Sequence, residues 1–211
     1  MSKIELVIDA ENKPANLPSP EVIIQQCRRA RAANSNIRGI PLVEESHDSV
    51  IHAWVKFGWI VTMSEAQTQH FVAQVLNDKA GVAVRSPYVY VAFQSDGIGY
   101  IVMEYIDGST CDDSDAKLVA TAVQSLITVQ GPTAEPGPVG GGPIVHRFFI
   151  DWESSVTYNS VEVLEKHING ASVPLRLALP AYTFAGFRMI TLNTDSSLHG
   201  QDGTCQLPVR G

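Results

Sequence analysis

The chain has 211 residues, of which 45% are hydrophobic and 18% are charged. This composition is typical of a folded globular protein and excludes wholesale disorder, and the length suffices to bury one good core. The formal net charge of −7 argues against a nucleic-acid partner, because neutralising a phosphate backbone requires clustered Lys and Arg. The single basic cluster, Arg28, Arg29 and Arg31, is short and is expected to be a solvated helix face.

The three cysteines, Cys27, Cys111 and Cys205, lie far apart and form no CxxC pair. This arrangement fits neither a disulfide framework nor a zinc site, and it suits a reducing compartment. The sequence begins with no basic-then-apolar leader, and no apolar run is long enough to cross a bilayer. We therefore expect a cytoplasmic protein without a membrane partner.

The first quarter of the chain predicts a strand, a helix and a hairpin. Residues 3–8 (KIELVI) are typical of a short strand, and residues 21–33 are predicted to be a helix, with Ser19 as its cap and Pro20 at its start. Short apolar runs between residues 37 and 60 favour strands, and the polar stretch 44–49 between them indicates a turn.

A helix is predicted from about Ser64 to Asn77. Thr62 and Glu65 stand three residues apart, as in a capping box, and an apolar stripe follows at helical spacing. Glu65 therefore has one structural role, as the acid of the cap, that does not exclude a second one.

Two strands at 87–93 (PYVYVAF) and 100–106 (YIVMEYI) follow, and Asp96-Gly97 between them favours a hairpin turn. A helix is predicted over about 113–130. The breaker-rich stretch GPTAEPGPVGGGP precedes a shorter helix at about 160–168. Beyond Asn169 the residues carry few charges and no clean periodicity, and we expect residues 170–211 to be a poorly ordered tail.

This order of elements is that of a protein kinase-like N-lobe running into a C-lobe. Such enzymes place a Lys on the strand before the helix, where it holds nucleotide phosphates, and a Glu on the helix, which pairs with that Lys. Lys56 lies in the predicted strand WVKFG, and Glu65 begins the helix that follows.

The blocks VKFG, SEAQTQHFV, SPYVYVAF and YIVMEYIDG resemble the N-lobe and hinge of the aminoglycoside phosphotransferase/choline kinase-like family. PGPVGGGP and YNSVEVLEKHIN resemble the start of the C-lobe in one branch of that family. The resemblance covers about residues 37–169 and implies an α+β fold. It consists of an N-lobe with an antiparallel sheet and one C-type helix, followed by a partial helical C-lobe.

The resemblance implies four segments. They are an N-terminal extension with a helix (1–36), an N-lobe with its hinge (37–106), the start of a helical C-lobe (107–169) and an atypical tail (170–211).

It also implies a set of residues that bind Mg-ATP. Lys56 would hold the α- and β-phosphates with Glu65 as its partner, and Met103 would lie behind the adenine. The backbone groups of Glu104 and Ile106 would then hydrogen-bond the adenine. A hairpin at about 38–50 would cover the phosphates, and the partners implied are a nucleotide and a small hydroxylated acceptor.

Each of these assignments has a structural alternative. Lys56 is an ordinary surface lysine if the context is ignored, and MEYI at 103–106 is then only a buried strand. The Gly140–Gly142 run lacks a following Lys-Ser/Thr, so a turn is favoured over a phosphate loop. The six histidines show no HxxxH or HExxH spacing, so no structural metal is expected.

The family's catalytic loop, H-x-D-x-x-x-x-N, is missing from this sequence, because no Asp is followed by Asn five positions later. Without that Asp and Asn, neither the base nor a magnesium ligand of phosphoryl transfer is present, so no catalytic residue is assigned. Catalysis is therefore expected to be incomplete in this form, and a non-catalytic nucleotide-binding or protein-interaction remnant is the alternative.

We expect residues 170–211 to stem from a shifted reading frame, a retained intron or a faulty gene model. The apolar face of the 113–130 helix would then be partly exposed at Leu118, Val119, Ala122 and Leu126.

Overall fold

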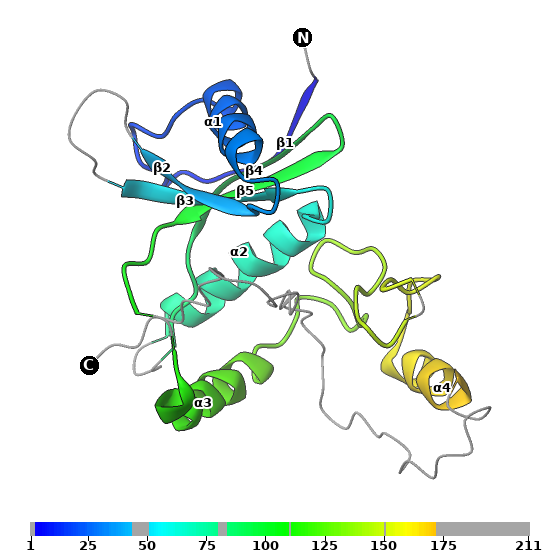
Figure 1. Cartoon of the computed structure of the whole chain (residues 1–211). Coiled ribbons are helices and arrows are strands. Elements are labelled where there is room, and N and C mark those ends of the chain that lie inside the picture. The colour runs from blue at the N-terminus through cyan, green and yellow to red at the C-terminus, as the bar shows by residue number, and fades with distance from the viewer. Residues whose placement is uncertain (1–2, 44–50, 80–83, 110, 150, 172–211) are drawn as a thin grey trace.

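The computed structural model describes residues 3–43, 51–79, 84–109, 111–149 and 151–171 (Figure 1). Within these ranges the protein is α+β, with a five-stranded antiparallel sheet and four α-helices. The strands are β1 (Ile4–Asp9), β2 (Gly39–Val43), β3 (Ile51–Gly58), β4 (Val89–Ser95) and β5 (Ile98–Glu104). The helices are α1 (Pro20–Ala33), α2 (Met63–Asn77), α3 (Ala116–Ile127) and α4 (Val161–Ala171), with a 3-10 turn at Asp113–Asp115 before α3.

The strand order in the sheet is β1-β4-β5-β3-β2, and all neighbours are antiparallel. β3 therefore lies inside the sheet, with Lys56 opposite Gly39 of β2 on one side and Ile101 of β5 on the other. The first strand pairs with β4, so that Leu6 lies opposite Phe93. Within the predicted N-terminal extension, β1 thus joins the same sheet as β3, β4 and β5, and α1 packs on that sheet.

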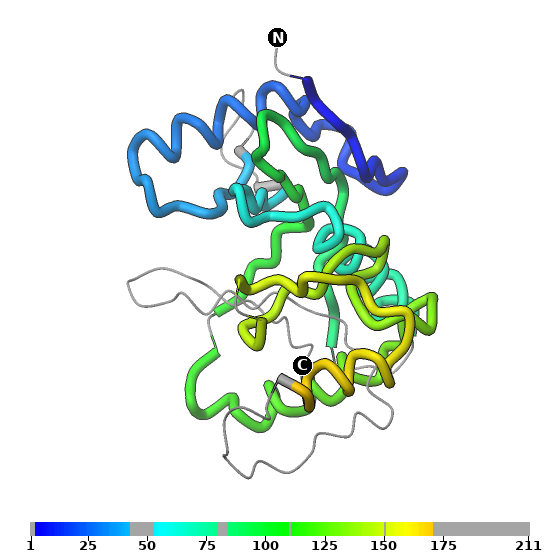
Figure 2. The backbone as a smooth tube through the Cα atoms, turned by 90° about the vertical axis from the view of Figure 1, so that its right-hand side faces the viewer, coloured from blue at the N-terminus to red at the C-terminus, as the bar shows by residue number. Residues whose placement is uncertain are grey.

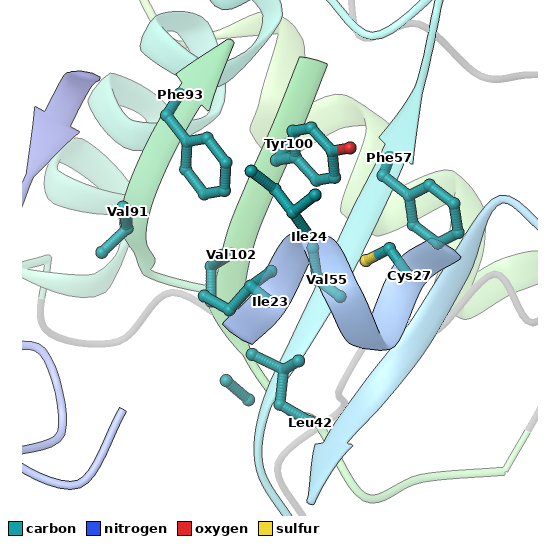
Figure 3. Close-up of a cluster of buried hydrophobic side chains, with 11 residues drawn as sticks. Ile23, Ile24, Cys27, Leu42, Val55, Phe57, Val91, Phe93, Tyr100 and Val102 are labelled. Atoms are coloured by element: carbon teal, nitrogen blue, oxygen red, sulfur yellow. The ribbon is translucent and has the colours of Figure 1, made fainter. Parts of the chain in front are cut away.

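Helix α1 packs on one face of the sheet and α2 on the other (Figure 1). Successive side chains of a strand point to opposite faces, and β4 and β5 bury apolar residues on both. The face beneath α1 carries the larger core, in which β3, β4 and β5 contribute alternate residues (Figure 3). Its buried members are Ile23, Ile24, Cys27, Leu42, Ala53, Val55, Phe57, Val91, Phe93, Tyr100 and Val102.

The α2 face has a smaller core of Val61, Ala66, Val89, Ala92 and Ile101. The chain reverses sharply between β3 and α2, and at this point the backbone lies directly against β5. A Cβ atom added to Gly99 would lie 2.0 Å from the carbonyl oxygen of Val61, so only glycine permits this approach. This close packing sets the position of the first turn of α2 relative to the sheet.

The local signals in the sequence correctly located the hairpin and the start of α2. Asp96 and Gly97 have φ angles of 51° and 74°, the left-handed pair that a two-residue hairpin turn requires. Thr62 is the N-cap of α2, and its side chain accepts a hydrogen bond from the Glu65 amide. Ser19 is at the N-cap of α1, as predicted, but its side chain makes no capping hydrogen bond.

Helix α3 packs against the C-terminal half of α2 in a cluster with Val72, Leu76, Val84 and Val129. The prediction that Ala122 would be exposed is wrong, because Ala122 lies in this cluster and is 5% exposed. Leu126 is partly buried there too, whereas Leu118 is 48% exposed, as expected. The helix is also shorter than the predicted 113–130, because its first three residues form the 3-10 turn and it ends at Ile127.

The segment between α3 and α4 lies against α2, where the Val139 amide donates to the buried Thr68 hydroxyl at 3.0 Å (Figure 2). Helix α4 closes a small separate core with Ile144, Phe149 and Tyr158.

No helix among the described ranges combines the length and apolarity needed to cross a membrane. The tail was predicted over 170–211, but Gly170 and Ala171 form the end of α4, and its residues from 172 onward lie outside the described chain. The predicted turn at 44–49 also lies outside the described chain.

Candidate functional site

The α2 face of the sheet contains an ion pair between the two residues that the sequence singled out. The Lys56 Nζ atom lies 2.5 Å from Oε1 of Glu65, with side chains that are 25% and 14% exposed. Val55 and Phe57 belong to the core beneath α1, so the strand alternation directs Lys56 to the opposite face, toward α2. The structure therefore brings a cation and a carboxylate together across the junction of strand and helix.

The cap of α2 determines where the Glu65 side chain points. The Glu65 amide donates to Thr62 Oγ1 at 3.1 Å, which holds Glu65 in the first helical turn, while its carboxylate extends to β3. The second oxygen, Oε2, is buried and has no hydrogen-bond partner among the described residues. Buried carboxylate oxygens normally have a hydrogen-bond partner, so this atom is an exception that the Lys56 contact alone does not satisfy.

Two further residues surround the ion pair on the same face. Trp54 precedes Lys56 by two positions and lies opposite Met103 of β5 in the strand register. The indole of Trp54 covers Gly39, because a Cβ on that glycine would come within 2.7 Å of Nε1. Met103 packs at the edge of the core under α2, and its sulfur accepts a hydrogen bond from Gln69 Nε2 at 3.3 Å.

Glu104, the last residue of β5, is held by its side chain and its backbone. Oε1 lies 2.5 Å from Nη2 of Arg85, Oε2 accepts from the Tyr88 amide at 3.3 Å, and the Glu104 amide donates to the Tyr88 carbonyl at 2.8 Å. The Arg85 guanidinium also lies over the Tyr88 ring, 5.6 Å from its centroid. Burial raises the pKa of the nearby Tyr90, and the negative charge of Glu104 raises it further.

Ile106 is buried, with 8% of its surface exposed, and it follows Glu104 in a stretch without regular structure. The Glu104 N–H is already occupied by Tyr88, so this residue can offer a ligand only its carbonyl oxygen. No backbone partner within the described chain binds the Ile106 N–H. The two residues together can therefore present one acceptor and one donor.

Of the hairpin predicted over residues 38–50, the structure describes the first strand, β2, which pairs with β3, the strand that carries Lys56. Gly39 lies opposite Lys56 as a result, and residues 44–50 are outside the described chain.

Sequence reasoning missed Trp54, Gln69 and Arg85. The two-residue spacing of Trp54 from Lys56 places both on one face of a strand, and the four-residue spacing of Gln69 from Glu65 places both on one side of a helix. These two spacings were available as signals, whereas nothing local pairs Arg85 with Glu104. Among the described residues, no three His, Cys, Asp or Glu side chains are grouped so that they could hold a metal ion.

Comparison with protein families, with curated proteins and with solved structures finds no match for this chain. The resemblance to the aminoglycoside phosphotransferase/choline kinase-like family stays a prediction, carried by the sequence blocks. The α+β sheet and the side-chain arrangement around Lys56 are the facts from which a function has to be argued.

Proposed function

We propose that this chain binds ATP on the α2 face of its sheet, in the manner of a kinase-like phosphotransferase. The observation that carries the proposal is the 2.5 Å pair between Lys56 and Glu65. A lysine Nζ has three N–H donors, and Glu65 takes one of them. The carboxylate fixes the ammonium group in one place and leaves donors for phosphate oxygens.

The surroundings of Lys56 suit the other parts of a nucleotide. Trp54 offers a flat aromatic surface beside the lysine, and such a surface stacks on a purine irrespective of its substituents. Glu104 and Ile106 supply an acceptor and a donor at the end of β5, which match the 6-amino group and the N1 atom of adenine. Met103 lies between these two features.

The order of elements supports a kinase-like reading of this site. A strand with a lysine, a helix with a glutamate, a two-stranded hairpin and a hinge follow one another in β3, α2, β4 and β5. Helices α3 and α4 would belong to the start of a C-lobe. In this proposal the phosphate acceptor is a small hydroxylated molecule, and magnesium accompanies ATP without a resident metal site.

Nucleotide binding without phosphoryl transfer is the second candidate. It is favoured by the sequence, in which no Asp has an Asn five positions later. Transfer through this mechanism requires such a pair, because the Asp takes the proton of the acceptor hydroxyl and the Asn holds magnesium.

Isothermal titration calorimetry of the full chain with Mg-ATP tests the binding proposal. We expect wild-type protein to bind and Lys56→Ala to bind about 10- to 100-fold more weakly, the loss that follows from removing a charged hydrogen bond. Lys117→Ala, which removes an exposed lysine of α3, is the matched control and should bind as wild type does. Equal affinities for the Lys56 variant and the wild type, with both proteins folded by circular dichroism, would refute the site.

An ADP-release assay separates the two candidates. Release that depends on a small hydroxylated acceptor and disappears in Lys56→Ala supports a transferase. ATP binding without acceptor-dependent release supports a binding module. Turnover that survives Lys56→Ala removes Lys56 from the mechanism.

A further inference from the structure

Helix α2 makes a second polar contact with the sheet, one turn beyond Glu65. Gln69 Nε2 donates to the sulfur of Met103 at 3.3 Å, and both side chains are partly buried. Residues four apart on a helix share a side, so Glu65 and Gln69 reach two different strands from the same side of α2. Glu65 contacts β3, and Gln69 contacts β5.

From this contact we infer that Gln69 is a positioning residue, which holds the Met103 side chain against α2 and thereby sets the purine selectivity of the site. The inference rests on the proposed nucleotide site. A methionine side chain has three rotatable bonds and fills irregular space, so its position depends on what restrains it. The Gln69 amide supplies that restraint, although a thioether is only a weak acceptor.

The part of the purine affected follows from the geometry of β5. Met103 directly precedes Glu104, whose carbonyl is the acceptor available to a 6-amino group. A substituent on that amino group therefore extends toward Met103. In the strand register Trp54 pairs with Met103, so the indole and the thioether lie next to each other on the α2 face of the sheet.

The contact is separate from the phosphate-binding pair. The hydrogen bond of Gln69 goes to Met103, whereas Lys56 is held by Glu65. Loss of the Gln69 amide should consequently change which bases bind and leave the interaction with phosphates intact. This distinguishes a positioning role from general damage to the fold.

The first test needs no nucleotide. Protein labelled with ¹³C at the methionine methyl groups has four such signals, and Met103→Leu identifies the one from Met103. We expect Gln69→Leu to shift this signal toward the averaged position of a freely rotating side chain. The matched control is Gln74→Leu, the same change at an exposed position of α2, and it should leave the signal in place.

The second test measures selectivity as the ratio of the calorimetric Kd values for N6-benzyl-ATP and ATP. We expect the ratio to fall about fivefold or more in Gln69→Leu, the size of a coupling between contacting residues, and to stay unchanged in Gln74→Leu. Met103→Ala should lower the ratio further. Adding Gln69→Leu to Met103→Ala should then have no effect, since the side chain to be positioned is gone.

The outcomes separate this inference from the proposed function. If Gln69→Leu neither moves the Met103 signal nor changes the ratio of Kd values, the role of Gln69 is overturned. The nucleotide site still stands in that case if wild-type protein binds ATP and Lys56→Ala does not. Wild-type protein that is folded yet binds neither nucleotide overturns both. An additive effect of Gln69→Leu on top of Met103→Ala overturns the claim that Gln69 acts through Met103.

Discussion

Replacing Lys56 with methionine tests the ion pair, because it leaves the Glu65 carboxylate without its cation. The Glu65 carboxylate is 14% exposed, and its Oε2 atom has no partner in the described part of the chain. Once the ammonium group is gone, the carboxylate has no partner in the described chain, because Thr62 binds only the Glu65 backbone amide, and its charge is uncompensated. The cost of the substitution should therefore exceed the value of a surface salt bridge.

The burial of the two side chains sets the size of the effect. Removing one partner of a fully buried pair costs about 3–5 kcal/mol, whereas an exposed pair contributes about 0–1 kcal/mol. With side chains 25% and 14% exposed, this pair lies between those limits, and we expect Lys56→Met to lower the free energy of unfolding by about 2 kcal/mol. In a domain of this size the melting temperature should fall by roughly 4–8 °C.

The double variant Lys56→Met/Glu65→Leu gives the sharper expectation. Replacing both charges with apolar side chains of similar volume removes the pair and leaves no buried charge without a partner. The effect of such a double replacement on stability is often close to neutral. We therefore expect the double variant to be more stable than Lys56→Met alone. The two single changes and the double change form a cycle with a coupling of at least about 1 kcal/mol.

Urea unfolding followed by circular dichroism measures all four proteins, and Lys117→Ala serves as the exposed control. A double variant whose loss of stability equals the sum of the single losses, within about 0.5 kcal/mol, would show that the two side chains are independent. That result would refute the ion pair as the link between β3 and α2.

Three other predictions concern the cap, a tight contact and a buried thiol. Thr62→Ala should lower the free energy of unfolding by about 1 kcal/mol, because it removes the acceptor of the Glu65 amide, and Ser19→Ala only by a few tenths. Gly99→Ala should cost about 3 kcal/mol, since its Cβ would lie 2.0 Å from the Val61 oxygen and the backbone must move. Burial raises the pKa of the Cys27 thiol from 9.0 to about 12, so the unfolded chain loses this proton first and stability should fall as the pH rises from 9 toward 12.

Matched comparisons decide each of these. Equal losses for Thr62→Ala and Ser19→Ala in chemical denaturation would contradict the capping assignment. A Gly99→Ala protein with the same melting temperature as the wild type would show that the backbones at Gly99 and Val61 lie farther apart than described. For the thiol, the free energy of unfolding should fall less steeply between pH 9 and 12 in Cys27→Ala than in the wild type. Equal slopes would show that other groups cause the fall.

Local structure was largely predictable from the sequence because its signals are local. The Thr62 cap, the Asp96-Gly97 turn and the strand WVKFG each depend on neighbouring residues, and each occurs where it was predicted. The pairing of Lys56 with Glu65 also followed, since a short turn separates the strand from the helix.

Long-range contacts could not be predicted in this way. β1 pairs with β4 across more than eighty residues, and no pattern in residues 4–9 names that partner. Ala122 was expected to be exposed because the atypical tail would leave this helix without a C-lobe core, and the helix sequence alone does not identify the partners that it has on α2. Within the site, the link from Arg85 to Glu104 joins two segments whose sequences contain no mutual signal.

The position of β1 and α1 has a practical consequence for the design of shorter expression fragments. A fragment starting at residue 37 would retain the whole candidate site and still lose the edge strand and the helix above the larger core. Val55, Phe93 and Val102 would then face water, and β4 would present a bare hydrogen-bonding edge to other molecules. Such a fragment should self-associate, so crystallisation or screening of the site calls for a fragment that begins no later than β1.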